Sequence, residues 1–243
     1  MISAALGGGV LSLSYVSVLS GWAMGLILTV VGCIAGMWSN ILIAKMATEY
    51  NIRNLDEMAF KAGGNCLRKF LQIMMLLYVC GACIGYQIFM GELLCYMMEQ
   101  LLPKRDDNFL ESFEFRLIVN APIAGVILFP LSMKRDMSSL AFAGVFSVAA
   151  LTYTLFVLVI ETPFYYREWK NMPLIEARAF IIDWNIFTSC SLIFFAYTCQ
   201  MSIMPVYSEL VRPNYRRIKT VITRALLTDF VFYLLIANAG YFS

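Results

Sequence analysis

The 243-residue sequence contains no histidine and few charged residues. Without histidine, the protein has no imidazole to ligate zinc or to act as the base of a catalytic triad. Charged side chains make up 14% of the residues, whereas a soluble domain carries roughly 25%. The net charge is only +2, with no basic stripe, which excludes a nucleic-acid-binding domain. The sequence also lacks a cluster of nucleophile, base and oxyanion donors, so it does not predict an enzyme.

Apolar residues dominate instead. They make up 60% of the sequence, and the mean hydropathy is +0.74. A water-soluble fold of this length cannot bury so much apolar surface, so we expect an all-α, multi-pass integral membrane protein with residues 1–243 in a single transmembrane domain. A membrane-spanning helix needs about 20 apolar residues. Seven segments meet this requirement, namely 2–19, 21–48, 67–100, 116–133, 137–160, 184–208 and 217–242. A short amphipathic segment, 55–62, precedes the third and ends at Gly63 and Gly64.

The distribution of positive charge predicts the orientation of the chain. Lysine and arginine are enriched in cytoplasmic loops. Of the eighteen positive residues, twelve lie in one set of loops and flanks, and six lie in the opposite, more acidic set. We therefore expect the N-terminus to be cytoplasmic. A heptahelical receptor has its N-terminus outside the cell, so the predicted cytoplasmic N-terminus argues against a receptor.

Two of the predicted spans carry signals of interruption. The first contains three consecutive glycines, Gly7 to Gly9. They free backbone amides and allow close approach of a ligand, although a packing face for a neighbouring helix would also explain them. The sixth contains Pro205, which cannot donate to the carbonyl of Met201, and several mid-span polar residues. A simple proline kink is the alternative there.

Considered together, the two signals favour a transporter. Discontinuous helices at corresponding places in two halves of a sequence point to a transporter binding site. The N-terminus of a half-helix offers amide donors to an anion, and exposed carbonyls accept a cation. Since an amino acid carries both charges, it is a ligand that such a site would bind.

These two segments resemble the amino acid/auxin permeases of the amino acid–polyamine–organocation superfamily. Gly-Gly-Gly-Val-Leu-Ser-Leu-Ser-Tyr, from Gly7 to Tyr15, resembles the Gly-Ser-Gly-Ile-Leu-Gly-Leu-x-Tyr motif of that family. The stretch from Phe195 to Leu210, Phe-Ala-Tyr-Thr-Cys-Gln-Met-Ser-Ile-Met-Pro-Val-Tyr-Ser-Glu-Leu, is similar to Phe-Ala-Phe-x-Cys-His-x-x-x-Leu-Pro-Ile-Tyr-x-Glu-Leu. The second motif belongs to the sodium-coupled neutral amino acid transporter branch.

The resemblance implies a leucine-transporter-like fold of about eleven helices, the first ten in two inverted repeats of five, with the first and sixth helices interrupted. Seven helices are present in this sequence. Residues 1–160 would form the first repeat, and residues 184–243 the first two helices of the second. We expect helices 8–11 to be missing and a chain of these seven helices alone to be non-transporting.

By the same resemblance, the substrate lies between the two interruptions. The carboxylate would accept hydrogen bonds from the amides of Gly7, Gly8, Gly9 and Val10. The ammonium would bind the carbonyls of Phe195, Ala196 and Thr198. The side chains of Tyr197 and Cys199 would shape the pocket for the substrate side chain.

The coupling ion stays open between Na⁺ and H⁺, and no other cofactor is expected. Ser3 stands where the sodium-coupled branch carries an asparagine, so Ser3 and Leu6 would form half of a sodium site, whose other half belongs to the missing eighth helix. Gln200 and Ser202 replace the histidine and glutamate of that branch. Asp229 lies near the middle of the seventh span and is a candidate for proton coupling; a structural carboxylate is the alternative.

The leading functional hypothesis is secondary active transport of amino acids by alternating access, in the plasma membrane or in a vacuolar or lysosomal membrane. A transporter-like amino acid sensor and a non-transporting fragment are the alternatives. Lipid and an amino acid are the expected partners.

The predicted orientation can be tested at the loop 101–115. With the N-terminus inside, this loop follows the third span and lies outside, so we expect an impermeant protease or label to reach it in intact cells. Mass spectrometry of the peptides provides the measurement. Reaction only after the membrane is opened would contradict the orientation and revive the receptor hypothesis.

Overall fold

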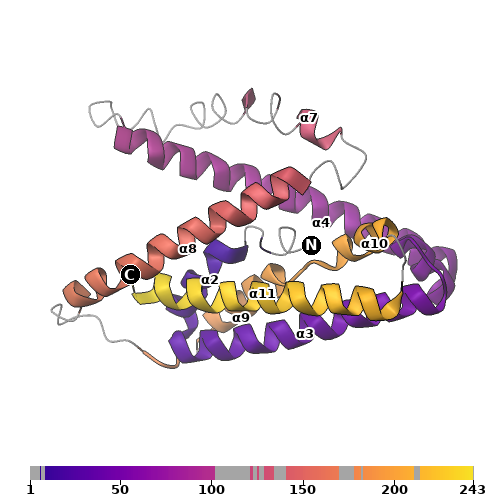
Figure 1. Ribbon diagram of the computed structural model, residues 1–243, viewed down its shortest axis with the longest axis horizontal. Coiled ribbons are helices and arrows are strands. Elements are labelled where there is room, and N and C mark those ends of the chain that lie inside the picture. Colours follow the sequence, from indigo (N-terminus) through magenta and orange to yellow (C-terminus); the bar gives the residue numbers. More distant parts are fainter. Residues whose placement is uncertain are drawn as a thin grey trace. The chain divides into compact units, whose positions relative to one another are not determined.

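The computed structural model describes most of the chain, and the described residues fold as helices without strands. These residues are 6, 9–101, 121–122, 125, 129–133, 141–169, 178–181, 183–210 and 214–242. The described helices are α2 (Gly9–Ser20), α3 (Trp22–Glu49), α4 (Leu55–Leu101), α7 (Phe129–Ser132), α8 (Ala141–Trp169), α9 (Asn185–Ala196), α10 (Gln200–Glu209) and α11 (Tyr215–Phe242) (Figure 1). The predicted all-α class is confirmed.

Five segments of the described chain are long and apolar enough to cross a membrane. They are Trp22–Glu49, Leu55–Met97, Gly144–Pro163, Asn185–Glu209 and Tyr215–Tyr241. These correspond to the second, third, fifth, sixth and seventh predicted spans. Of the first predicted span, the structure describes α2 and Leu6, while the fourth falls mostly outside the described residues.

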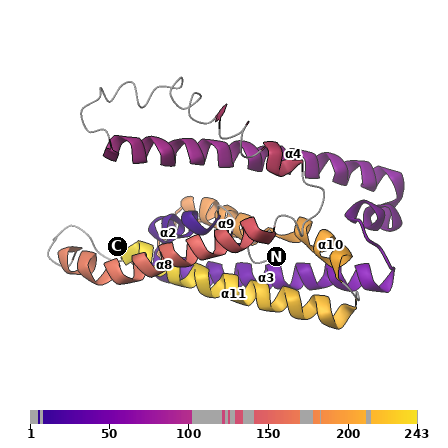
Figure 2. The same cartoon turned by 45° about the horizontal axis from the view of Figure 1, so that its top comes forward.

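The chain forms two compact units. One comprises Met1–Met58 and Ala141–Ser243, and the other comprises Ala59–Leu140. This division differs from the proposed boundary between repeats, which stays a prediction. In the second unit, the chain leaves helical geometry at Gly63 and Gly64, and Gly64 has a positive φ of 70°. This is where the glycine pair predicts the end of segment 55–62. Beyond it, α4 continues as one long helix (Figure 2).

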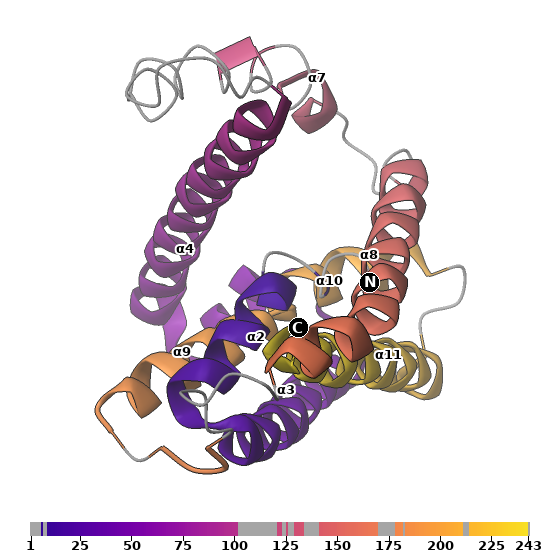
Figure 3. The same ribbon diagram turned by 90° about the vertical axis from the view of Figure 1, so that its left-hand side faces the viewer.

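In the first unit, α3 packs closely against its neighbours because its buried face consists of small residues. The end-on view shows α3 grouped with α2, α9 and α11 (Figure 3). A Cβ atom on Gly32 would lie 2.5 Å from Cγ2 of Ile193, and one on Gly36 would lie 3.3 Å from Cβ of Tyr197. Small residues allow helix backbones to approach in a membrane, where no hydrophobic effect draws helices together. The buried residues of α3 are Gly25, Thr29, Gly32, Cys33, Gly36, Asn40, Ala44 and Ala47.

The corner between α2 and α3 is stabilised by a distant segment. Gly21 makes the corner with a φ of 89°, a conformation that favours glycine. The backbone N–H groups of Trp22 and Ala23 donate to the carbonyls of Arg178 and Ala179, at 3.2 and 3.1 Å. The first N–H groups of a helix have no partner within it, so these carbonyls cap the start of α3.

The close packing of α3 predicts that Gly32→Ala destabilises the protein by about 1–3 kcal/mol, because the new methyl group would push Ile193 away. Thermal unfolding of the purified protein in detergent provides the measurement. Gly81→Ala is the matched control, since a Cβ there meets nothing within 4 Å in the described structure. Equal melting temperatures for the two variants would contradict the packing argument.

Candidate functional site

The sixth predicted helix is interrupted between α9 and α10. Helix α9 ends at Ala196, and Tyr197, Thr198 and Cys199 form a non-helical turn before α10 begins at Gln200. The interruption is therefore confirmed, but the argument from Pro205 was wrong about its cause. Pro205 lies inside α10, six residues beyond the turn. The chain leaves helical geometry where other groups can satisfy its backbone, upstream of the proline.

Most backbone groups of the turn find local partners. The N–H of Thr198 donates to the carbonyl of Phe195 at 3.1 Å, and the N–H of Cys199 donates to that of Tyr197 at 3.0 Å. The Thr198 hydroxyl donates to the carbonyl of Phe194 at 2.7 Å. At the start of α10, the N–H of Ser202 donates to the carbonyl of Cys199 at 3.0 Å. An interruption at this depth needs such pairing because the hydrocarbon core supplies no water.

The start of α2 lies against the end of α9. A Cβ atom on Gly9 would lie 2.6 Å from the Cα of Ala196, so only glycine allows this approach without movement of the backbone. Val10 is buried beside it, as is Leu6 just before the helix. The structure thus brings the start of α2 to the end of α9, and the substrate contacts implied by the resemblance stay a prediction. Gly7, Gly8 and Ser3 lie outside the described residues, so only Leu6 of the predicted sodium half-site is placed.

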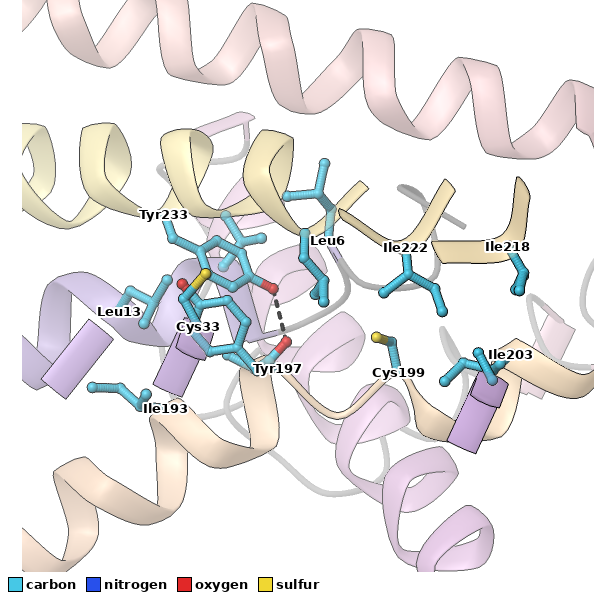
Figure 4. Packing of buried hydrophobic residues seen from close by; sticks show 14 of the residues in the cluster. Leu6, Leu13, Cys33, Ile193, Tyr197, Cys199, Ile203, Ile218, Ile222 and Tyr233 are labelled. Atoms are coloured by element: carbon cyan, nitrogen blue, oxygen red, sulfur yellow. Dashed lines mark hydrogen bonds between the residues drawn. The ribbon is translucent and has the colours of Figure 1, made fainter. Parts of the chain in front are cut away.

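Tyr233 of α11 caps the C-terminal end of α9 with a hydrogen bond. Its hydroxyl donates to the carbonyl of Ala196 at 2.8 Å, and both residues are buried (Figure 4). The ring of Tyr233 lies edge-on to that of Tyr197, with ring centroids 5.0 Å apart. Two of the three carbonyls expected to receive an ammonium, those of Phe195 and Ala196, therefore already accept a hydrogen bond from the protein itself. An ammonium would have to share or displace these donors.

The five predicted residues of the turn region differ in their surroundings. Ala196, Tyr197 and Cys199 are buried, and Thr198 is half-buried. Phe195 is 37% exposed, and it takes part in the turn through its backbone carbonyl, which accepts the hydrogen bond from Thr198. Among the side chains predicted to shape a pocket, Tyr197 packs against the small face of α3 at Gly32.

Sequence reasoning missed Tyr233 and Asn40. The side-chain amide of Asn40, in α3, donates to Sγ of Cys199 at 3.3 Å, and Asn40 is fully buried. A polar amide in the middle of an apolar span was a signal that could have identified it. Tyr233 carries a weaker signal, namely its position four residues after Asp229 on one face of α11.

Asp229 is fully buried near the middle of α11. Among the described residues, it is the only aspartate, glutamate, lysine or arginine that is buried. Neither of its carboxylate oxygens has a hydrogen-bond partner there. Leu226 and Tyr233 lie one turn to either side of it on the buried face. Cys33 of α3 and the two buried side chains of the turn, Tyr197 and Cys199, lie within range of its charge.

Comparison with known proteins shows the family of the chain. The family described as transmembrane amino acid transporter protein matches residues 1–243. The chain is 26% identical over its whole length to a Toxoplasma gondii protein named as amino acid transporter AAT1, and it covers 32% of that protein. It is 22% identical, over 98% of its length, to the sodium-coupled neutral amino acid symporter 2 of Danio rerio, of which it covers 51%. A third relative, vacuolar amino acid transporter 2 of Saccharomyces cerevisiae, is 30% identical over 51% of the chain. The matched region makes up 25% of that protein.

The chain thus spans between a quarter and about half of the length of these curated relatives. No solved structure gives a significant match.

The hydrogen bond from Tyr233 predicts that Tyr233→Phe lowers the stability of the protein by about 1–3 kcal/mol, because the buried carbonyl of Ala196 loses a donor that water cannot replace. Thermal unfolding in detergent without added ligand measures the effect. Tyr153→Phe is the control, since Tyr153 is 71% exposed. An equally small shift for both variants would show that the bond contributes nothing.

Proposed function

The chain belongs to the transmembrane amino acid transporter family, and from this premise we propose that the protein is a secondary transporter that carries amino acids across a membrane by alternating access. The substrate binds at the turn between α9 and α10, beside the start of α2. The observation that carries this proposal is the contact between Gly9 and Ala196, since it brings the N-terminus of one helix to the C-terminus of another.

The chemistry of these two helix ends matches the two charges of an amino acid. At the start of α2, the amides of Gly9 and Val10 belong to the first turn, whose N–H groups have no partner within the helix. These amides and the helix dipole favour a carboxylate. At the end of α9, the carbonyls of Phe195, Ala196 and Thr198 favour an ammonium. A zwitterion bound between them would have each charge next to the helix end that stabilises it.

The other implied residues complete the site in this proposal. Gly7 and Gly8 extend the row of amides that receives the carboxylate. The side chains of Tyr197 and Cys199 form the wall facing the substrate side chain, and their positions are supported by Gly32 and Asn40 of α3. Both supports are buried, so the wall is held by α3 and would move with it.

The protein is a multi-pass membrane protein, and we place its N-terminus in the cytoplasm, as the excess of positive charge indicates. The membrane is either the plasma membrane or a vacuolar or lysosomal membrane; relatives named as a vacuolar transporter and as a sodium-coupled symporter support this choice. Transport is driven by a cation gradient, of Na⁺ bound near Ser3 and Leu6 or of H⁺.

The proposed site predicts that Gly9→Leu abolishes saturable amino acid uptake by the full-length protein. The leucine side chain would occupy the space between α2 and Ala196, where a single Cβ already lies too close. Uptake of a mixture of radiolabelled amino acids into proteoliposomes measures this, with the amount of reconstituted protein determined in parallel.

Gly85→Leu is the matched control, because a Cβ on Gly85 meets nothing within 4 Å in the described structure. We expect its uptake to equal that of the unmodified protein. If Gly9→Leu also transports normally, the substrate does not bind at this junction. If the unmodified full-length protein transports no amino acid, the proposed function itself fails.

A further inference from the structure

We propose that Asp229 binds the proton that drives transport, so that one proton crosses the membrane with each amino acid. This inference rests on the proposed function, because it assigns the coupling ion to a residue beside the proposed substrate site. It starts from the two unpartnered carboxylate oxygens of Asp229 in the middle of α11, at a depth where the bilayer offers no water.

Among the described residues, no lysine or arginine is buried beside Asp229, and the N-terminal ammonium is a positive group whose charge acts on the carboxylate. The groups that face it and can titrate are Cys33 from α3, Tyr197 and Cys199 from the turn between α9 and α10, and Tyr233 from α11 itself. All four are neutral at physiological pH. From α2, Val10 and Leu13 pack into this core, and the hydroxyl of Ser14 donates to the carbonyl of Ile236 in α11 at 3.1 Å. From α8, the partly buried residues that pack against the core include Val148, Leu151 and Leu155.

An ionised carboxylate without a partner is costly in such a place, and adding a proton removes most of that cost. With α11 packed against α3 and the turn, as described here, Asp229 is therefore neutral. The ionised form requires either water, which reaches the residue when the site opens to one side, or a donor. The hydroxyl of Tyr197, which lies beside the thiol of Cys33, is such a donor.

Tyr233 connects this carboxyl group with the substrate site. It lies one helical turn from Asp229 on the same buried face, and its hydroxyl donates to the Ala196 carbonyl proposed for the substrate ammonium. Any displacement of α11 that hydrates Asp229 therefore also withdraws Tyr233 from this carbonyl. Tyr233 acts as a positioning residue, through which protonation and substrate binding depend on one another.

The transport cycle is balanced in protons and charge. A carboxylate oxygen of Asp229 takes a proton from water on the side of higher proton concentration, and the neutral carboxyl group and the zwitterionic substrate are enclosed together. When the site opens to the other side, both are released, and the empty carrier returns with the carboxylate ionised and paired with Tyr197. Each cycle therefore moves one amino acid and one positive charge.

The test uses the full-length protein in proteoliposomes that contain a pH-sensitive dye. For the unmodified protein, adding amino acid outside should acidify the lumen, and an inward proton gradient should drive accumulation that a protonophore abolishes. For Asp229→Asn, whose amide resembles the protonated carboxyl group, accumulation should fall about tenfold or more and lose its dependence on pH. Exchange of labelled for unlabelled amino acid should persist, because exchange needs no net proton movement.

Asp183→Asn is the matched control, since Asp183 is exposed and its carboxylate accepts hydrogen bonds from its neighbours Trp184 and Asn185. It should accumulate amino acids normally. Full proton-driven accumulation by Asp229→Asn would overturn the proposal, as would a folded Asp229→Asn protein that has lost exchange.

The unmodified protein decides the question even if Asp229→Asn does not fold. Amino acid uptake without movement of protons overturns the role of Asp229 and leaves the proposed function intact. The absence of both uptake and exchange overturns the proposed function.

Discussion

The absence of water in the membrane interior is the constraint on which the rest of this structure depends. Every backbone N–H and carbonyl at that depth needs a partner inside the protein. The chain nevertheless abandons helical geometry at Tyr197, Thr198 and Cys199, and it does so where backbone groups, a threonine hydroxyl and the hydroxyl of Tyr233 supply the missing partners. The interruption is a stable feature because these groups surround it.

Close packing of the helices makes this possible. The buried face of α3 consists of small residues, and Gly32 and Gly36 leave room for Ile193 and Tyr197 at the end of α9. Gly9 does the same for α2. With larger residues at these positions, the helices would stand further apart, and Tyr233 would not reach the carbonyl of Ala196. The same glycines therefore serve both stability and the geometry of the proposed site.

Polar atoms without partners gather near the interruption. In the described part of the chain, they include Oδ1 of Asn40, the hydroxyl of Tyr197, Oε1 of Gln200 and both carboxylate oxygens of Asp229. Each such group costs free energy when it is buried, and proteins that keep such groups usually use them. All four residues carry atoms that can accept a hydrogen bond, so the region is suited to receive a proton or an ammonium group.

The sequence by itself determined the class of the protein and the approximate place of its interruption. Apolar runs of sufficient length predict membrane helices because the bilayer acts on each segment separately, and five such spans lie where the hydropathy indicates. The glycine pair at 63 and 64 likewise ends a helical segment through its own backbone. Pro205 misled, because a proline removes one hydrogen bond and strains one turn of a helix, and α10 remains helical around it.

The tertiary structure alone decided which groups meet at the interruption. Tyr233 reaches Ala196 across 37 residues, and Asn40 reaches Cys199 across 159. Such pairings depend on the rotation and separation of whole helices, which small residues on the buried face of α3 set collectively. Hydropathy identified Asp229 as a buried acid, but only the packing of α3, α11 and the turn left its carboxylate without a partner and placed it beside the proposed substrate site.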